Sequence, residues 1–273
     1  MTTLLQISDA HFGTERPPVV QALLHLARDH TPDLVVLSGD ITQRARPSQF
    51  SAARAFIDQL KPAALLAIPG NHDIPLYNVF ARALMPYANY IRAFGNNLEP
   101  DFESEQLLVL GINTTRPHRH KDGELSPAQI ERVTQRLRAA SASQLRIVVV
   151  HQPVLAIRAS DEDNLLDGHK EAVPAWANAG GDIIMGGHIH LPYVHSMRTT
   201  FPLLKRDIWT VQAGTAVSSR IREGINNSVN LIHCEGARSP RRCSVERWDY
   251  TAVSARFEHH STQELSFASS DAV

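Results

Sequence analysis

The sequence predicts an α/β fold with mixed sheets of the α+β type, in which parallel and antiparallel strands are combined. From the N-terminus to Met185, short apolar runs typical of strands buried on both faces alternate with segments of helical periodicity. This alternation favours right-handed crossovers and a largely parallel sheet. Beyond Trp209, short strands follow one another across Gly, Ser and Arg turns without helices, which favours antiparallel pairing against a second sheet.

The predicted strands are the runs that are apolar and rich in β-favouring residues. They cover residues 4–8, 34–37, 63–68, 107–112, 147–150 and 183–185, followed by 209–212, 228–233 and 243–249. Helices are predicted between them over residues 17–30 and 47–61, both of which begin at proline. A further helix is expected after Ser126, which stands three residues before Gln129 in a capping-box pattern.

The segment 74–100 interrupts this regular pattern. It is rich in aromatic residues on both sides of Pro86, which breaks a helix, and short helices or a cap-like insertion are therefore expected there. The end of the chain, 259–273, is small, polar and unpatterned, which predicts a loosely ordered tail. We therefore expect one domain over residues 1–258 that contains the insertion.

Composition limits the partners. The chain has 273 residues, 43% hydrophobic and 20% charged, with a formal net charge of -1, so it can bury a large core and has no general attraction for nucleic acid or anionic membrane. No stable nucleic-acid partner is indicated, and a homo-oligomer stays open.

No apolar run is long enough for a membrane span and the N-terminus lacks a signal-peptide pattern, so we expect a cytoplasmic protein. Cys234 and Cys243 are expected as reduced thiols on neighbouring strands.

Polar side chains follow the predicted parallel strands, at the point where each strand ends. They are Asp9, His11, Asp40, Asn71, His72, Asp73, His151, His188 and His190. The carboxyl ends of parallel strands meet at one edge of a sheet, so these groups are expected to converge. Taken singly, Asp9 or Asp40 could instead cap a helix, and His151 could satisfy a buried carbonyl. Together, nitrogen and oxygen ligands without thiolate suit Mn, Fe or Zn, and their number suits two metal ions.

Five separated motifs resemble the calcineurin-like metallophosphoesterase superfamily, in the same order, over residues 4–235. They are Asp9-Ala10-His11, Gly39-Asp40, Gly70-Asn71-His72-Asp73, His151 and Gly187-His188-Ile189-His190. The resemblance implies a four-layer αββα sandwich. It also implies that Asp9, His11 and His190 hold one divalent or mixed-valence metal ion. Asn71, His151 and His188 would hold the second ion, with Asp40 bridging both.

The implied chemistry is hydrolysis of a phosphoester. Two cations about 3.5 to 4 Å apart can lower the pKa of a bridging water and orient its attack on phosphorus. The resemblance implies that His72 assists the leaving oxygen as a proton donor. Asp73 is expected either to accept a hydrogen bond from His72 and fix its tautomer or to cap the turn.

Residues 4–12 and 212–220 resemble the bacterial branch that contains class III cyclic nucleotide phosphodiesterases and glycerophosphodiesterases. They predict a small phosphodiester substrate similar to a cyclic nucleotide. One alternative is a pyrophosphatase acting on a nucleotide-sugar or lipid-linked nucleotide, which would require an apolar cap near residues 77–94. Another is a non-catalytic scaffold on the same fold. Arg44, Arg46 and Arg220 are expected as surface arginines, with phosphate contact as the alternative.

Overall fold

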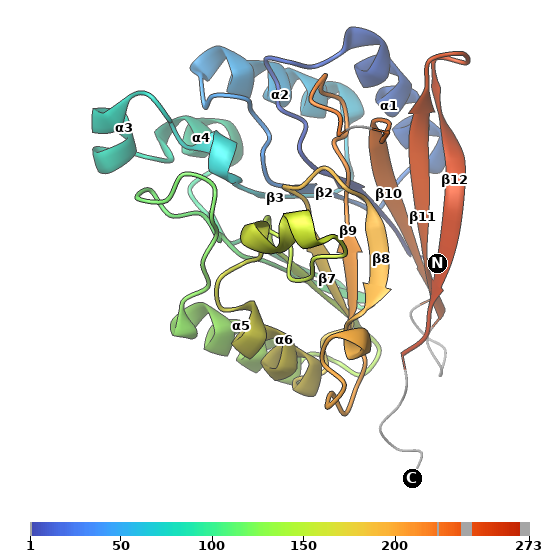
Figure 1. The fold of residues 1–273 in the computed structure, drawn as a ribbon. Coiled ribbons are helices and arrows are strands. Elements are labelled where there is room, and N and C mark those ends of the chain that lie inside the picture. The colour runs from blue at the N-terminus through green and yellow to red at the C-terminus, as the bar shows by residue number, and fades with distance from the viewer. Residues whose placement is uncertain (1, 223, 236–241, 268–273) are drawn as a thin grey trace.

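The computed structural model describes residues 2–222, 224–235 and 242–267. Two six-stranded sheets pack face to face between two helical layers (Figure 1). Helices α1 (Pro17–His30) and α2 (Pro47–Leu60) cover one sheet, and α5 (Pro127–Ala139) and α6 (His169–Asn178) cover the other. The predicted four-layer αββα sandwich is confirmed.

The first sheet has the strand order β12-β11-β10-β1-β2-β3. Its strands are β1 (Thr2–Ile7), β2 (Leu34–Ser38), β3 (Leu65–Ile68), β10 (Ser228–Glu235), β11 (Arg242–Thr251) and β12 (Arg256–Leu265). β1, β2 and β3 are parallel, whereas β10, β11 and β12 add antiparallel strands beside β1. The buried thiols of Cys234 and Cys243 face each other across β10 and β11 and are free, as expected.

The second sheet has the order β4-β5-β6-β7-β9-β8. Its strands are β4 (Asp101–Glu103), β5 (Leu107–Gly111), β6 (Leu145–Val149), β7 (Ile183–Gly186), β8 (Tyr193–Ser196) and β9 (Trp209–Gln212). The antiparallel pairing expected for residues 209–212 is only half correct. β9 pairs antiparallel with β8 but parallel with β7, because β8 occupies the sheet edge and leaves β9 beside β7.

Three apolar cores hold the four layers together. One lies between α1, α2 and the first sheet, and another between α5, α6 and the second sheet. The third lies between the sheets, where Val36, Ile68, Val149 and Met185 are fully buried. Burial on both faces explains the unbroken apolar runs of these strands, and it fixes the carboxyl ends of the two parallel sets side by side.

The prediction of a loosely ordered tail over 259–273 is wrong for its first part. β12 runs to Leu265 and pairs antiparallel with β11, while 268–273 lie outside the described residues. Of the side chains in β12, only Phe257 and Leu265 are buried, because the strand is at the sheet edge and largely faces solvent. Such a strand has no continuous apolar run to mark it in the sequence.

The segment 74–100 forms two short helices with different surroundings. α4 (Ala88–Phe94) packs against α2, where Tyr90 and Phe94 contact the ring of Phe50. α3 (Val79–Leu84) projects from the body of the molecule, and the side chain of Phe80 is 83% exposed (Figure 1). Short 3-10 helices lie at Asn71–Asp73, Ala159–Asn164 and Met197–Thr199. No helix in the described part of the chain is long and apolar enough to cross a membrane.

Candidate dinuclear metal centre

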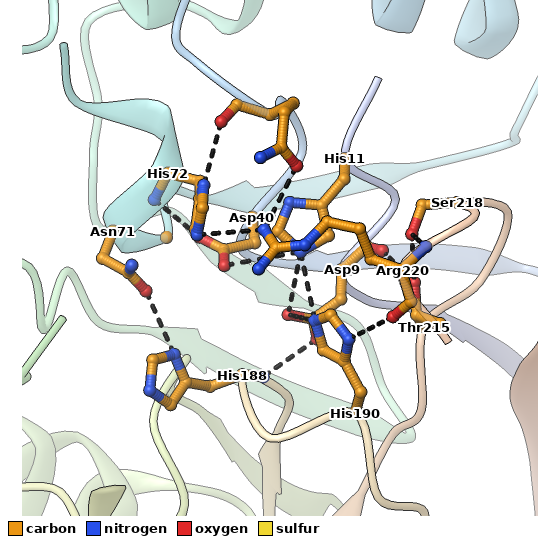
Figure 2. Close-up of polar contacts among 12 residues, drawn as sticks. Asp9, His11, Asp40, Asn71, His72, His188, His190, Thr215, Ser218 and Arg220 are labelled. Carbon is orange, nitrogen blue, oxygen red and sulfur yellow. Dashed lines mark hydrogen bonds and ion pairs between the residues drawn. The ribbon is translucent and has the colours of Figure 1, made fainter. Parts of the chain in front are cut away.

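The predicted ligands come together at the carboxyl ends of the parallel strands of both sheets, and Figure 2 labels all of them except His151. Asp9 and His11 follow β1, Asp40 follows β2, Asn71 begins the 3-10 helix after β3, His151 follows β6, and His188 and His190 follow β7. Two clusters result, Asp9–His11–His190 and Asp40–His151–His188, and within each cluster the ligand atoms lie within 4.8 Å of one another. His72 joins His11 and Asp40 within the same distance.

The backbone at this edge is unusual. Asp9, His11, Asp40, His188 and His190 have φ values of 50°, 44°, 49°, 71° and 54°. Non-glycine residues seldom adopt this left-handed region, and each such residue costs of order 1–3 kcal/mol unless its surroundings impose it. Strain repeated at five of the seven predicted ligands is typical of a functional site.

Close packing of glycines allows the two halves of the site to meet. A Cβ at Gly70 would collide with the backbone nitrogen and carboxylate of Asp40. A Cβ at Gly187 would collide with Ser8 and with the carboxylate of Asp9. Both motif glycines are therefore required for close approach of the loops.

The first cluster brings together ligand atoms that suit a cation. The Nε2 atoms of His11 and His190 are 3.1 Å apart, and His190 Nε2 is 3.3 Å from Asp9 Oδ1. This Asp9 oxygen is buried and has no hydrogen-bond partner among the described residues. Two imidazoles and a carboxylate facing one point match the donor set of Zn, Mn or Fe, so these residues fit the metal that the fold implies.

The second cluster shares Asp40 with the first. His151 Nε2 lies 3.2 Å from Asp40 Oδ1, whereas His11 Nε2 lies 3.8 Å from Asp40 Oδ2. The Asn71 side-chain oxygen is 3.0 Å from His188 Nδ1 and 3.3 Å from His151 Nε2. The two oxygens of one buried carboxylate thus face the two clusters, as a bridging ligand requires.

Backbone carbonyls orient two of the imidazoles. His151 Nδ1 donates to the carbonyl of Ser38 at 2.9 Å, and His190 Nδ1 donates to the carbonyl of Arg220 at 2.6 Å. A carbonyl can only accept, so each Nδ1 carries a proton, and each Nε2 faces the cluster, where its lone pair is available once any proton on that atom is lost. This arrangement is common around metal-binding histidines.

The nearby imidazoles lower the pKa values of the two carboxylates in the site. Burial would raise the pKa of Asp9, but the imidazoles of His190 and His151 outweigh it and lower that pKa to about 2. The pKa of Asp40 is likewise held well below its usual range, because His151 and His72 outweigh its burial. Both carboxylates are therefore ionised and ready to bind a cation.

The pKa values of the histidines in the site are shifted in opposite directions. Burial, only partly offset by Asp40, lowers the pKa of His11 to about 3, and burial together with His151 lowers the pKa of His188 to about 4. For His151 the carboxylate of Asp40 outweighs burial and raises the pKa to about 9. Two of these candidate ligands are thus neutral in advance, and the third, His151, must lose a proton to bind a metal.

Of the two alternatives predicted for Asp73, the hydrogen bond with His72 is wrong. His72 Nδ1 donates to the backbone carbonyl of Gln43 at 2.9 Å. The buried Asp73 carboxylate instead accepts from the amides of Ile41, Thr42 and Gly70 at 3.1, 2.8 and 2.9 Å, and from the Thr42 hydroxyl at 2.9 Å. Asp73 therefore caps its turn and ties it to the loop after β2, which is the alternative that the sequence left open. Burial and the nearby Asp40 raise the pKa of Asp73 to about 6 despite these bonds.

Residues outside the predicted metal ligands and the His72–Asp73 pair complete a cleft of about 560 Å³ over the two clusters. Its lining includes Lys121, Asn164, Arg220 and Arg222. The side chain of Arg220 lines the cleft, and phosphate contact, the alternative given for this residue, stays a prediction. Arg44 instead lies over the Tyr77 ring at 5.0 Å, and Arg46 precedes α2 as its N-cap. Among these positions, Arg220 lies in the segment 212–220 that carried a sequence signal. Gln43 had none, because its contact with His72 is made through the backbone.

The fold and the paired clusters define the metallophosphoesterase class, and comparison with known proteins agrees. The family model of calcineurin-like phosphoesterases matches residues 2–192, and the chain belongs to this family. A probable cyclic nucleotide phosphodiesterase of Synechococcus is 25% identical over 210 residues, which are 72% of this chain and 77% of that protein. The glycerophosphodiester phosphodiesterase GpdQ of Enterobacter lignolyticus is 37% identical over 82 residues, or 26% of this chain and 29% of that protein.

Two solved structures share the fold at low sequence identity. A dimetal phosphatase from Danio rerio superposes with a TM-score of 0.69 at 11% identity, covering 98% of this chain and 99% of that one. A purple acid phosphatase from yellow lupin gives a TM-score of 0.69 at 13% identity, covering 97% of this chain and 53% of that one. At this identity the similarity establishes the fold alone.

Proposed function

We propose that this chain is a dinuclear metal-dependent phosphodiesterase that hydrolyses a small diester, with a cyclic nucleotide as the leading substrate. The observation that carries the proposal is the Asp40 carboxylate, whose two oxygens face the two ligand clusters at 3.2 and 3.8 Å from His151 and His11. The Synechococcus relative bears the name of a probable cyclic nucleotide phosphodiesterase, and this name supports the choice of substrate.

Asp9, His11 and His190 would hold one metal ion, and Asn71, His151 and His188 the other, with Asp40 shared. Bound there, the ions would activate a water molecule and offset the charge of the phosphate. His72 stands beside this site, and its Nδ1 is fixed by the Gln43 carbonyl, so its Nε2 is directed toward Arg220 and the clusters. We assign to this nitrogen the delivery of a proton to the leaving oxygen.

A second function is favoured by one observation. The side chains of Tyr77, Phe80 and Leu84 on and beside α3 are 76%, 83% and 76% exposed, so an apolar surface projects from the segment that follows the His72 turn. Such a surface would suit a pyrophosphatase whose nucleotide substrate carries a lipid. The non-catalytic scaffold is disfavoured by the complete set of ligand side chains.

One substrate panel separates these functions. The Mn²⁺-loaded protein would be assayed with 3′,5′- and 2′,3′-cyclic nucleotides, glycerophosphodiesters, an aryl diester, an aryl monoester and a nucleotide-sugar pyrophosphate. The proposal expects the highest kcat/KM among the diesters. A clear preference for the monoester would overturn the substrate class, and a preference for the pyrophosphate would establish the second function instead.

A further inference from the structure

The guanidinium of Arg220 meets His72 at the edge of the ligand clusters (Figure 2). Its Nη1 lies 3.2 Å from His72 Nε2 and donates to the side-chain carbonyl of Gln43 at 3.1 Å. The backbone carbonyl of the same glutamine accepts from His72 Nδ1 at 2.9 Å. Gln43 therefore positions both the imidazole and the guanidinium, through two different carbonyl groups.

Donor and acceptor rules define how the two groups meet. A guanidinium can only donate, so His72 Nε2 accepts from Arg220 while His72 Nδ1 carries the ring proton. The arginine thus points an N–H group at the same imidazole atom that we assigned to the leaving oxygen. An oxygen placed within hydrogen-bond reach of His72 Nε2 would lie close to Arg220 as well.

The backbone of Arg220 is anchored on the metal-binding side of the site. Its carbonyl accepts from Nδ1 of His190, a proposed ligand, at 2.6 Å, and its amide donates to the Ser218 hydroxyl at 3.1 Å. The side chain is exposed to the cleft, and within the described residues no carboxylate forms an ion pair with it. This positive charge is therefore available to a ligand, unlike that of Arg222, which lies 3.0 Å from Asp161.

We propose that Arg220 is a catalytic residue that hydrogen-bonds the leaving-group oxygen and stabilises its developing negative charge. The proposal rests on the phosphodiesterase function above. As the oxygen of water bonds to phosphorus, the bond from phosphorus to the leaving oxygen breaks, and its electron pair stays on that oxygen. When that oxygen replaces His72 Nε2 as the acceptor of the Arg220 N–H, Nε2 carries a proton taken up from solvent, and His72 passes this proton to the leaving group, which becomes an alcohol. The attacking water releases one proton to solvent in exchange. Arg220 donates a hydrogen bond throughout and transfers no proton.

The dependence of rate on the leaving group distinguishes this role from two others. If Arg220 contacts the leaving oxygen, its loss will slow esters of weakly acidic alcohols most, because they develop the most charge on that oxygen. If it binds a non-bridging phosphate oxygen, all esters will be slowed alike. If it is only a surface charge, none will be slowed.

The experiment uses the full chain loaded with Mn²⁺ and a series of methyl aryl phosphodiesters whose phenols differ in acidity. Arg220→Met should lower kcat by roughly 10²-fold for the least acidic phenol, comparable to loss of one oxyanion donor, and by much less for nitrophenol. Arg220→Lys should recover part of this loss. Arg54→Met removes an exposed arginine of α2 paired with Asp58 and should behave as wild type.

Gln43→Ala supplies an independent check, because it removes the contact to Arg220 and retains the backbone carbonyl that holds His72. It should steepen the dependence on phenol acidity less than Arg220→Met does. Metal content, measured by elemental analysis, should be unchanged in both variants. An equal loss for every phenol, or no loss, in Arg220→Met would overturn the assignment while leaving the phosphodiesterase function intact. A wild-type protein that hydrolyses none of these diesters would overturn that function and the assignment together.

Discussion

The two sheets contribute different chemistry to the site. The first sheet supplies every proposed oxygen ligand, from Asp9, Asp40 and Asn71, together with the His11 imidazole. The second supplies only imidazoles, from His151, His188 and His190. Each proposed metal position needs ligands from both, so neither sheet could form the site alone. The difference teaches that the metal centre depends on the packing between the sheets as much as on its ligands.

The loops of the two sheets are also held in different ways. Those of the first sheet are joined to each other by the Asp73 carboxylate. Those of the second sheet are bonded to the first: His151 Nδ1 donates to the Ser38 carbonyl, and the His188 amide donates to Asp9 at 2.9 Å. The first sheet therefore acts as the frame against which the imidazoles are aligned.

Removal of the shared carboxylate should have the largest effect. Asp40→Ala deletes the only proposed ligand common to both metal positions, so both ions should be lost and kcat/KM should fall by at least about 10⁴-fold, since each ion contributes several kcal/mol. Turnover and elemental analysis measure this effect, with the exposed Asp58→Ala as the control. Full loading of both positions in Asp40→Ala would show that the sheets do not share a bridging ligand.

Loss of His72 should reduce the rate without removing metal. His72→Ala is expected to lower kcat for a poor leaving group by about 10²- to 10⁴-fold, the usual contribution of a general acid. Metal content should match the wild type, because His72 is assigned to the leaving group. The exposed His25 of α1 offers a matched control as His25→Ala. Wild-type turnover in His72→Ala with metals bound would remove His72 from the mechanism.

Removal of the Asp73 carboxylate, which joins the loops of the first sheet, should have a milder effect. Asp73→Ala leaves the amides of Ile41, Thr42 and Gly70 without their buried acceptor, so Asp40 and Asn71 should be less well aligned. Displacing such supporting groups typically costs 10- to 100-fold in metal affinity or activity. Titration with Mn²⁺ followed by activity would measure the shift. An unchanged midpoint of the Mn²⁺ titration would mean that the alignment of Asp40 and Asn71 does not depend on Asp73.

The pH dependence of metal binding should be no larger than the effect of Asp73→Ala. A metal ion binds only the neutral imidazole, and the pKa of His151 is raised to about 9 by Asp40. Below that pH the metal must displace this proton, so the affinity should fall as pH is lowered from about 9 to 7, by at most about tenfold per unit. His11 and His188, with pKa values of about 3 and 4, add nothing in this range.

Competition with a coloured chelator across this pH range measures the effect, and His151→Asn should bind more weakly and without the same slope. A metal affinity that is constant from pH 7 to 9 in the wild type would contradict the protonated state assigned to His151.

The sequence located the polar residues that cluster at the candidate metal centre better than the groups that support them, for a physical reason. Asp9, Asp40, His151 and His188 follow buried apolar strands, and both the strand pattern and the polar residue after it are visible in the chain itself. The partners of Asp73 are not, because Ile41 and Thr42 lie some thirty positions away and meet it only after β2 and β3 pair. The contact of Gln43 with His72 is also hidden, since any residue has a backbone carbonyl.

The strands followed the same rule. Those buried on both faces, such as β2 and β6, could be located from apolar runs, whereas β12 could not. Its pairing with β11 is held mainly by the backbone, and most of its side chains face solvent. Packing between distant segments, rather than local pattern, decides such elements.

The metal-to-protein ratio of the Mn²⁺-reconstituted chain tests the central claim most directly. Because His190 belongs to one cluster and His188 to the other, the wild type should bind two ions per chain, and His190→Ala and His188→Ala should each retain one. Elemental analysis after dialysis gives this ratio. A wild-type chain that binds a single ion, or variants that both keep two, would contradict a metal pair formed jointly by the two sheets.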